Sequence, residues 1–304
     1  MRGIDLFAGI GGSSTGAKAA GCHIVWAANH WPEAVNWHAQ NHPDTLHACQ
    51  DLHQARWEEL PPHDLMLASP CCQGHSNARG KNRPEHDASR STAWAPIAAA
   101  EVHKQDVVVI ENVPEFTDWA LYGPWVDCWN RLGYSVSPHI IDAADHGVAQ
   151  HRVRLFLVCT RSRNPVQLSL PRQPQTSAAE IIDLDTGNWS RIDKPGRSPK
   201  TLARARAGRA RFGELFVMPF YGSGSGLTGR DIRRPLGTLT TRDRWAVVHG
   251  DRMRMLTKEE VRRGMGFPDG TLLPRQHKLA VHLLGNAVCP PVMADILSAV
   301  KEAA

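Results

Sequence analysis

Two adjacent cysteines, Cys71 and Cys72, follow a short apolar run at residues 64–68 and are the first candidates for chemistry. The run has the composition of a buried parallel strand, so the thiols are expected at its carboxyl end, where open α/β sheets bind their ligands. A thiolate placed there is a nucleophile. Free cysteines are also among the most buried residues, so the pair alone does not exclude a purely structural role.

Charged residues stand at the ends of two further apolar segments. Glu111 follows the apolar run 106–110, and an unpaired carboxylate is too costly to bury there without a reason, which favours a site. Arg152 and Arg154 alternate along an extended segment, so they should share a face. Such a pair suits the clamping of an anion or a carboxylate, and a surface ion-pair strand is the alternative.

A glycine-rich turn follows the first apolar strand, predicted at residues 2–7. Glycines at this position permit a tight turn and let a ligand approach the amino end of the next helix, predicted at 13–20. The G-x-G-G run alone is a weak signal. A second strand, predicted at 23–28, ends at Asn29, where nucleoside-binding folds usually present an acid to the ribose.

Composition limits the class of protein. With 304 residues, 42% hydrophobic and 21% charged, the chain can form one large core and a smaller second domain. We see no apolar run near membrane-spanning length and no signal-peptide core, so we expect a cytoplasmic protein without a membrane partner. The seven cysteines show no C-x-x-C pairing, which argues against a disulfide framework and against a metal site.

The texture of the sequence changes between residues 162 and 250, which are rich in proline and poor in periodicity. We therefore predict one domain from residues 1–161 and 251–304 and a small loop-rich domain from 162–250. Residues 191–254 contain fifteen Lys or Arg against five Asp or Glu, the footprint of a polyanion-binding face. A solvated basic helix is the alternative reading for its arginines, which are Arg204, Arg206, Arg209 and Arg211.

Seven motifs in order make the chain resemble the DNA (cytosine-5)-methyltransferases, which use S-adenosyl-L-methionine. They are D-L-F-A-G-I-G-G (5–12), P-C-C-Q-G-H-S (70–76), E-N-V (111–113), Q-H-R-V-R (150–154), R-P-L-G-T-L-T-T (234–241), L-T-K-E-E-V-R-R-G-M-G-F-P-D (256–269) and G-N-A-V (285–288). The combination and its order are far more specific than any one motif.

The resemblance implies roles for the catalytic residues. Alignment of Gln73 and Ser76 makes Cys72 the nucleophile, with Gln73 in the catalytic loop and Ser76 among the DNA contacts. Glu111 resembles the glutamate that holds the cytosine ring, and Arg152 and Arg154 the pair that fixes the base, the glutamate and the loop. Thr240 and Thr241 resemble the threonine pair near the flipped nucleotide.

The resemblance also implies a cofactor site. Asp51 matches the residue that reads the adenine amine and Asn286 the asparagine near the methionine end. Asn29 stands where the family has a ribose-binding glutamate, and His30 where an aromatic residue packs on the adenine. The loop around the methionine moiety is matched by Phe7, Ala8, Gly9, Ile10, Gly11 and Gly12.

The expected architecture is a doubly wound, mixed, mostly parallel sheet with a smaller loop-rich target-recognition domain. The expected activity is methyl transfer to carbon 5 of a flipped-out cytosine in double-stranded DNA, through a covalent cysteine adduct and with no obligate protein partner. Restriction–modification systems are one setting for such enzymes. Three alternatives stay open: a tRNA cytosine as substrate, a modified S-adenosylmethionine donor, and a non-catalytic DNA-binding descendant.

Overall fold

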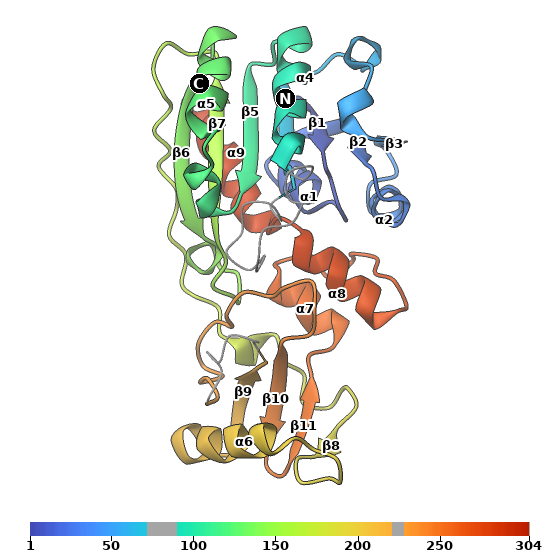
Figure 1. Cartoon of the computed structure of the whole chain (residues 1–304), viewed down its shortest axis with the longest axis vertical. Helices are drawn as coiled ribbons and strands as arrows, with labels where there is room; N and C mark the ends of the chain where they lie inside the picture. Colours follow the sequence, from blue (N-terminus) through green and yellow to red (C-terminus); the bar gives the residue numbers. More distant parts are fainter. Residues whose placement is uncertain (72–89, 221–227, 304) are drawn as a thin grey trace. The chain divides into compact units, whose positions relative to one another are not determined.

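The computed structural model describes residues 1–71, 90–220 and 228–303. The chain divides into two compact units, each described here by itself (Figure 1). The first contains residues 1–142, 153–172 and 287–304, and the second contains 143–152 and 173–286. The sequence predicts instead one domain from residues 1–161 and 251–304 and a target-recognition domain from 162–250. That assignment stays a prediction.

The first unit is built on a seven-stranded sheet in the order β3-β2-β1-β4-β5-β7-β6. β1 to β5 run parallel, whereas β7 is antiparallel to both β5 and β6. This mixed, mostly parallel sheet confirms the predicted fold class. Its strands are β1 (Arg2–Leu6), β2 (His23–Asn29), β3 (Leu46–Cys49), β4 (Leu65–Ala68), β5 (Val107–Asn112), β6 (Ser135–Asp142) and β7 (Val153–Thr160).

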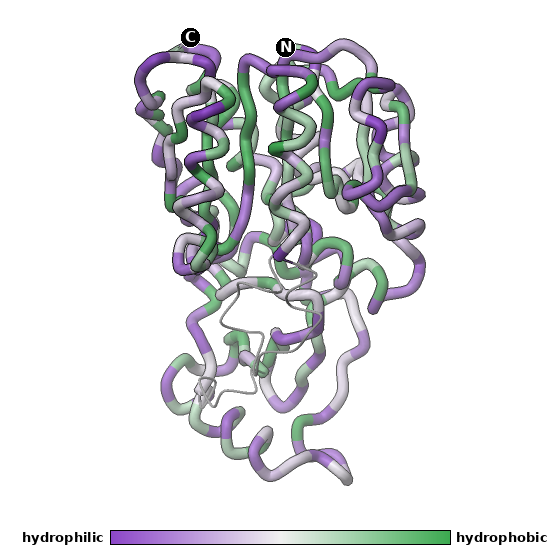
Figure 2. Tube along the Cα trace, turned by 45° about the horizontal axis from the view of Figure 1, so that its top comes forward, coloured by the Kyte–Doolittle hydropathy of each residue, from purple (hydrophilic) through white to green (hydrophobic). Residues whose placement is uncertain are grey.

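Helices cover both faces of this sheet. Ile4 and Leu6 of β1 share a core with Ala99 of α4 and Trp125 of α5, so these two helices pack on one face. The other face carries α1, whose Gly16 lies directly against α9. Figure 2 shows the long hydrophobic stretches that form the interior. The helices are α1 (Gly12–Ala19), α2 (Pro32–Asn41), α4 (Ala95–His103), α5 (Tyr122–Arg131) and α9 (Pro290–Ala303).

The second unit contains a four-stranded antiparallel sheet in the order β8-β11-β10-β9. The sequence did not predict this sheet, because its strands are at most five residues long and their buried residues show little alternation. Helix α6 packs on it through Gly208, where a β-carbon would collide with Phe216. The elements are β8 (Ser190–Arg191), α6 (Pro199–Phe212), β9 (Leu215–Pro219), β10 (Trp245–His249), β11 (Arg252–Met255), α7 (Lys258–Gly264) and α8 (His277–Asn286).

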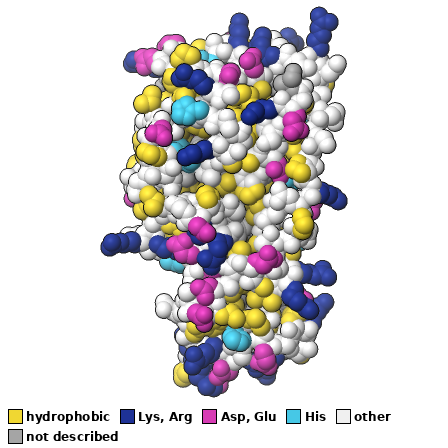
Figure 3. All heavy atoms as spheres, turned by 180° about the vertical axis from the view of Figure 1, so that it is seen from behind, with side chains coloured by type: hydrophobic (Ala, Val, Ile, Leu, Met, Phe, Trp, Pro, Cys, Tyr) yellow, Lys and Arg dark blue, Asp and Glu magenta, His cyan; other side chains and the backbone are white. Residues whose placement is uncertain are grey.

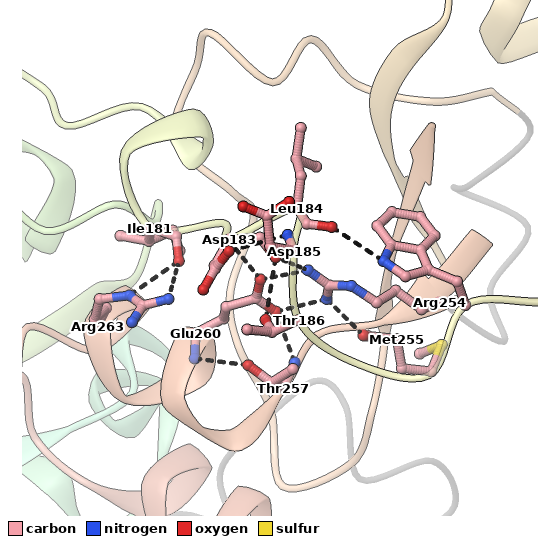
Figure 4. Close-up of polar contacts among 11 residues, drawn as sticks. Ile181, Asp183, Leu184, Asp185, Thr186, Arg254, Met255, Thr257, Glu260 and Arg263 are labelled. Atoms are coloured by element: carbon pink, nitrogen blue, oxygen red, sulfur yellow. Dashed lines mark hydrogen bonds and ion pairs between the residues drawn. The ribbon is translucent and has the colours of Figure 1, made fainter. Parts of the chain in front are cut away.

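A buried ion pair joins β11 to α7 in the second unit (Figure 4). The Arg254 guanidinium donates to both carboxylate oxygens of Glu260 at 2.6 and 2.7 Å, and their side chains are 1% and 0% exposed. Glu260 also accepts from the backbone N–H of Thr257, and its own N–H donates to the Thr257 hydroxyl, so the two residues form a capping box at the start of α7. Arg254 further donates to the carbonyl of Asp183, so the pair fixes a loop as well as a helix.

Residues 277–303 are apolar and long enough to cross a membrane by length and composition, with 72% of their most apolar window buried inside the protein. The sequence predicted no apolar segment near membrane-spanning length, and by length and composition alone this prediction was wrong. Helices α8 and α9 are apolar because they pack in the interior, and a mostly buried segment of this kind is weak evidence for a membrane span.

Candidate active site

The glycine-rich turn between β1 and α1 has an unusual backbone. Phe7, Gly9 and Gly11 have φ values of 62°, 57° and 99°, a region that glycine tolerates and an aromatic residue adopts only at a cost of about 1–2 kcal/mol. The turn ends at the start of α1, where no side chain caps the helix. A strained turn that leads into an uncapped helix start is a typical anion-binding arrangement.

Two glycines of this region are required by packing. A β-carbon on Gly12 would lie 2.1 Å from the carbonyl oxygen of Val288, and one on Gly16 would lie 2.5 Å from that of Pro290. The backbone after residue 287 therefore packs directly on the first turns of α1. This close approach explains why the G-N-A-V and D-L-F-A-G-I-G-G motifs occur in the same chain.

The residues expected at the nucleoside end already have intramolecular partners. The Asn29 side-chain oxygen accepts from the backbone N–H of Trp31 at 3.0 Å. Asp51 accepts from the backbone N–H and the ring of His53, at 3.0 and 2.8 Å, and these bonds hold the pKa of its carboxyl below the usual value. Asn29 and Asp51 follow the neighbouring strands β2 and β3, and His30 is exposed beside them.

Cys72, Gln73 and Ser76 lie outside the described residues, which end at Cys71 on this side. The structure shows how the chain is held just before them. The amide of Asn112 donates to the carbonyl of Pro70 at 3.2 Å, and the N–H of Cys71 donates to the Thr92 hydroxyl at 3.0 Å. Residues 70–71, called the cysteine segment from here on, are therefore tied to the end of β5 and to the start of the 92–103 helical segment.

Glu111 is the residue immediately before Asn112 on β5, and its partner is Arg154 on β7. The Arg154 Nε lies 3.1 Å from the Glu111 Oε1, and the two side chains are 18% and 10% exposed. The resemblance assigns Arg154 the task of fixing Glu111. The ion pair is compatible with that role, which stays a prediction. Because Asn112 holds Pro70, the ion pair and the cysteine segment meet at one strand end.

Arg152 has different partners from Arg154 and belongs to the second unit. It is 4% exposed, and its guanidinium donates to the carbonyls of Leu239 and Gly285 at 3.1 Å each. Gly285 in turn packs on the backbone of Thr240, where a β-carbon would lie 2.3 Å from the carbonyl carbon. Arg152 therefore organises the segment that carries Thr240 and Thr241, which is a different task from the shared clamp that the sequence suggested.

Two further residues, one in each unit, hold local backbone and were not singled out from the sequence. Gln150 is fully buried and bridges the N–H of Leu239 and the carbonyl of Gly264, at 2.9 and 2.7 Å. Asn112 holds the cysteine segment, as described above. Both stand inside recognised motifs, so the motif was the available signal, but their backbone partners are far away in sequence. Asn286 ends α8 and is exposed, and its role stays a prediction.

The four arginines predicted on the basic segment do not act alike. Arg209 donates to the carbonyl of Gly250 and lies 3.4 Å from Glu214, so it stabilises the unit. Arg204 lies over the ring of Phe220, with 5.1 Å to the ring centroid. Arg206 and Arg211 are exposed. Figure 3 shows one face of the molecule, on which Lys and Arg are interspersed with Asp and Glu.

A cavity of about 530 Å³ in the second unit gathers three cations, Arg211, Arg230 and Arg234, together with His151. Its acid, Asp231, is already bound by Arg233 at 2.8 Å. No carboxylate within the described ranges pairs with the three cavity arginines, and Arg230 instead lies 5.2 Å from the Trp245 ring centroid. Asp231 also feels the charge of Arg234, and hydrogen bonds from Arg233 together with this charge lower the pKa of its carboxyl, so the cavity as a whole carries more positive than negative charge. A concave site of this kind suits phosphate or another polyanion.

Comparison with known proteins decides the family. Residues 1–302 match the family described as C-5 cytosine-specific DNA methylase. The chain belongs to this family. This methylase is 25% identical over 315 residues to the type II methyltransferase M.MspI of Moraxella sp., an alignment that covers 99% of the chain and 70% of the relative. It is 26% identical to the type II methyltransferase M.HhaI of Haemophilus parahaemolyticus, covering 97% and 93%.

A solved structure shares the fold of this methylase. It is a DNA modification methyltransferase encoded within a prophage of E. coli, with a TM-score of 0.74 and 20% identity. The match covers 100% of this chain and 99% of the other. The chain is thus an enzyme of the cytosine-5 methyltransferase family, as its motifs predicted, and its relatives include type II methyltransferases.

Proposed function

We propose that this methylase transfers a methyl group from S-adenosyl-L-methionine to carbon 5 of a flipped-out cytosine in double-stranded DNA. One observation carries the proposal at the level of residues. The Glu111–Arg154 ion pair adjoins Asn112, which binds the carbonyl of Pro70, two residues before Cys72. The reaction requires a carboxylate and a thiol, and the carboxylate of Glu111 lies next to the residue that holds Pro70, two positions before Cys72 in the sequence.

The reaction begins at carbon 6 of the cytosine, because carbon 5 of the aromatic ring is a poor nucleophile. The Cys72 thiolate forms a bond to carbon 6, and the electron pair of the 5,6 double bond becomes available at carbon 5. When bound, the cofactor supplies an electrophilic methyl group. Loss of the proton from carbon 5 then restores the double bond and expels the Cys72 thiolate, so the enzyme is regenerated.

Glu111 and Arg154 position the ring during this addition. Glu111 holds ring nitrogen 3 and the exocyclic amine, and so stabilises the charge that develops as the thiolate adds. The ion pair to Arg154 fixes the orientation of the carboxylate. Gln150 and Arg152 act at a distance from the base, because their bonds organise the backbone at residues 239, 264 and 285.

The residues around the glycine-rich turn fit S-adenosylmethionine. The uncapped start of α1 offers N–H donors to the cofactor carboxylate, with the turn of residues 7–12 beside it. Asn29 and Asp51 follow adjacent strands and supply polar groups for the nucleoside. Asn29 is neutral where the family has glutamate, so a donor with an extra carboxylate would meet less repulsion here. This is the basis of the modified-donor alternative.

The second unit supplies the grip on DNA. A base inside a duplex cannot reach the thiol, so the nucleotide must leave the stack while the backbone is held. Arg211, Arg230 and Arg234 around the cavity are suited to hold phosphates, since they outnumber the one acid of the lining, Asp231, which is bound mainly by Arg233. A tRNA substrate is the second candidate, because its phosphates would suit the same arginines.

Transfer of a labelled methyl group to duplex DNA and to tRNA, measured side by side, tests the proposal. We expect label in duplex DNA, at cytosine carbon 5. Duplexes that contain 5-fluorocytosine should form a covalent complex, because fluorine at carbon 5 blocks the final elimination. Label in tRNA alone would assign the chain to the RNA-acting branch. DNA binding without transfer or trapping would indicate a non-catalytic descendant.

A further inference from the structure

A chain of hydrogen bonds runs from a buried carboxylate to the protein surface beneath the glycine-rich turn. The Ser14 Oγ lies 2.6 Å from Oδ2 of Asp5 and 3.0 Å from Nε2 of His38. The His38 Nδ1 lies 2.8 Å from Nε2 of His47. Asp5 and His38 are 0% and 1% exposed, whereas His47 on β3 is only partly buried. These hydrogen bonds therefore connect Asp5 on β1 to solvent.

No cation accompanies this carboxylate among the described residues. Three histidines with lowered pKa values face the network: His38 and His47, which are part of it, and His42 beside them. The one lysine is Lys18 on α1, which lies near His42. Burial, first of all, lowers the pKa of His42 to about 4 and that of His38 well below its usual value. His42 also packs directly on Gly11, where a β-carbon would lie 2.5 Å from its Nε2.

Every link of the chain can reverse its direction without losing a hydrogen bond. When Asp5 is ionised, Ser14 donates to Asp5, His38 donates from Nε2 to Ser14, and His47 donates from Nε2 to Nδ1 of His38. When Asp5 is protonated, Asp5 donates to Ser14, Ser14 to Nε2 of His38, and His38 from Nδ1 to His47. The two states differ by one proton, which enters at His47 while each group passes one proton inward.

We propose that Asp5 is a titratable counter-charge beneath the cofactor turn, reached by protons through Ser14, His38 and His47, and that it favours the positively charged methyl donor over its neutral product. The inference rests on the proposed function, because it requires S-adenosylmethionine in the turn. Asp5 contacts the first turn of α1 through Ser14, so its charge lies next to the proposed cofactor site. The donor carries a sulfonium and the product, S-adenosylhomocysteine, an uncharged thioether, so only the donor should respond to this charge.

The charge of Asp5 varies in the useful range of pH. Burial, only partly opposed by the Ser14 hydrogen bonds, raises the pKa of Asp5 to about 7. A bound sulfonium favours the ionised form and so lowers this pKa, which means that donor binding releases protons near neutral pH. Donor affinity should therefore fall as the pH drops from 8.5 to 5.5, while product affinity changes much less.

Calorimetric titration of the full chain with S-adenosylmethionine and with S-adenosylhomocysteine tests this, in buffers of different ionisation enthalpy between pH 5.5 and 8.5. The ratio of the two affinities should change by about five- to tenfold in the wild type, as expected for one partly screened charge pair. In Asp5→Asn, which is isosteric, the ratio of the two affinities should not change with pH. This variant also corrects for protons that the ligand's own amino group takes up or releases. The same pH dependence in both proteins would overturn this inference alone. No donor binding at any pH would overturn the proposed function and this inference together.

Two further measurements do not depend on the Asp5→Asn protein. Ser14→Ala removes a hydrogen bond that favours the carboxylate, so the midpoint of the affinity ratio should move to higher pH. An unchanged or lower midpoint would contradict the role of Asp5. In the ligand-free wild type, nitrogen-15 NMR should show His38 protonated on Nε2 at high pH and on Nδ1 at low pH. A single tautomer throughout would overturn the relay.

Discussion

Asp5 in the first unit and Glu260 in the second are both fully buried carboxylates, but their partners differ. Asp5 meets a serine hydroxyl and, beyond it, neutral imidazoles. Glu260 receives two bonds from Arg254 and one from the backbone of Thr257. A carboxylate with neutral partners can change its charge at neutral pH, whereas one bound by a guanidinium holds elements together.

The charged residues at the two candidate sites also differ in how far they are neutralised. In the first unit, Glu111 and Arg154 neutralise each other at the strand end that carries the cysteine segment. In the second unit, the acid of the cavity, Asp231, is bound mainly by Arg233, and the cavity keeps an excess of positive charge from Arg211, Arg230 and Arg234. Under the proposed function, the first unit would position the reacting groups and the second would present positive charge to the nucleic acid. Each prediction below tests one side of this division.

Replacement of the nucleophile should separate the two units most sharply. Cys72→Ser should lower methyl transfer by at least about a thousandfold, because a hydroxyl is a far weaker nucleophile than a thiolate at neutral pH. DNA affinity, measured by fluorescence anisotropy, should stay within a factor of about three. Cys71→Ala is the matched control and should keep activity. The opposite result for the two cysteines would move the nucleophile to Cys71.

Removal of the buried acid in the second unit should damage architecture. Glu260→Ala leaves Arg254 buried without its partner, which should cost about 3–5 kcal/mol in the free energy of unfolding. Glu259→Ala, one residue earlier on α7, removes a half-exposed partner of Arg262 and should cost less than about 1 kcal/mol. Thermal or urea unfolding measures both. Equal losses in the free energy of unfolding would mean that the buried Arg254–Glu260 pair is no more important for stability than the half-exposed one.

The cavity arginines should govern DNA affinity without affecting stability. Arg230→Ala and Arg234→Ala should each reduce the slope of log affinity against log salt by about 0.9, the value for one phosphate contact. The effect should appear on all sequences alike. Arg206→Ala is the control, since Arg206 is exposed on α6 and does not line the cavity. A loss as large in Arg206→Ala would place the DNA on another face.

The smallest effect is expected at Asn29, where the first unit lacks a charge. Asn29→Asp keeps an oxygen for the N–H of Trp31 and adds a negative charge for the ribose hydroxyls. Binding of S-adenosylmethionine, measured by calorimetry, should tighten by roughly tenfold or less, because charge-assisted hydrogen bonds are about twice as strong as neutral ones. No change would show that Asn29 does not face the ribose.

The sequence predicted the first unit well because its signals are local. Residues 106–110 and 155–159 are apolar runs, and the structure places them in neighbouring strands β5 and β7. The partners of Gln150 and Arg152 could not be read, because they are backbone groups 87 to 133 residues away.

The elements of the second unit were harder to predict, because the sequence carries little local signal for them. Its strands are short, and β8 has only two residues, so periodicity gives little signal over such lengths. Charge counting found the basic segment but could not separate Arg209, which binds the carbonyl of Gly250, from Arg211, which lines the cavity. The spacing of these two arginines on α6 places them on different sides, and only the packing shows which side faces the sheet.

The contact of α1 with α9 sets the order in which the protein can be assembled. Gly12 and Gly16 lie against the backbone after residue 287, and Lys301 donates to the carbonyl of Ala20 across 281 residues. During synthesis, the glycine-rich turn emerges first but cannot reach its final packing until the ribosome has released residues 287–303. Such long-range closure slows folding and leaves the glycine- and serine-lined face of α1 without its partner meanwhile. We expect the nascent chain to need chaperone protection until that point.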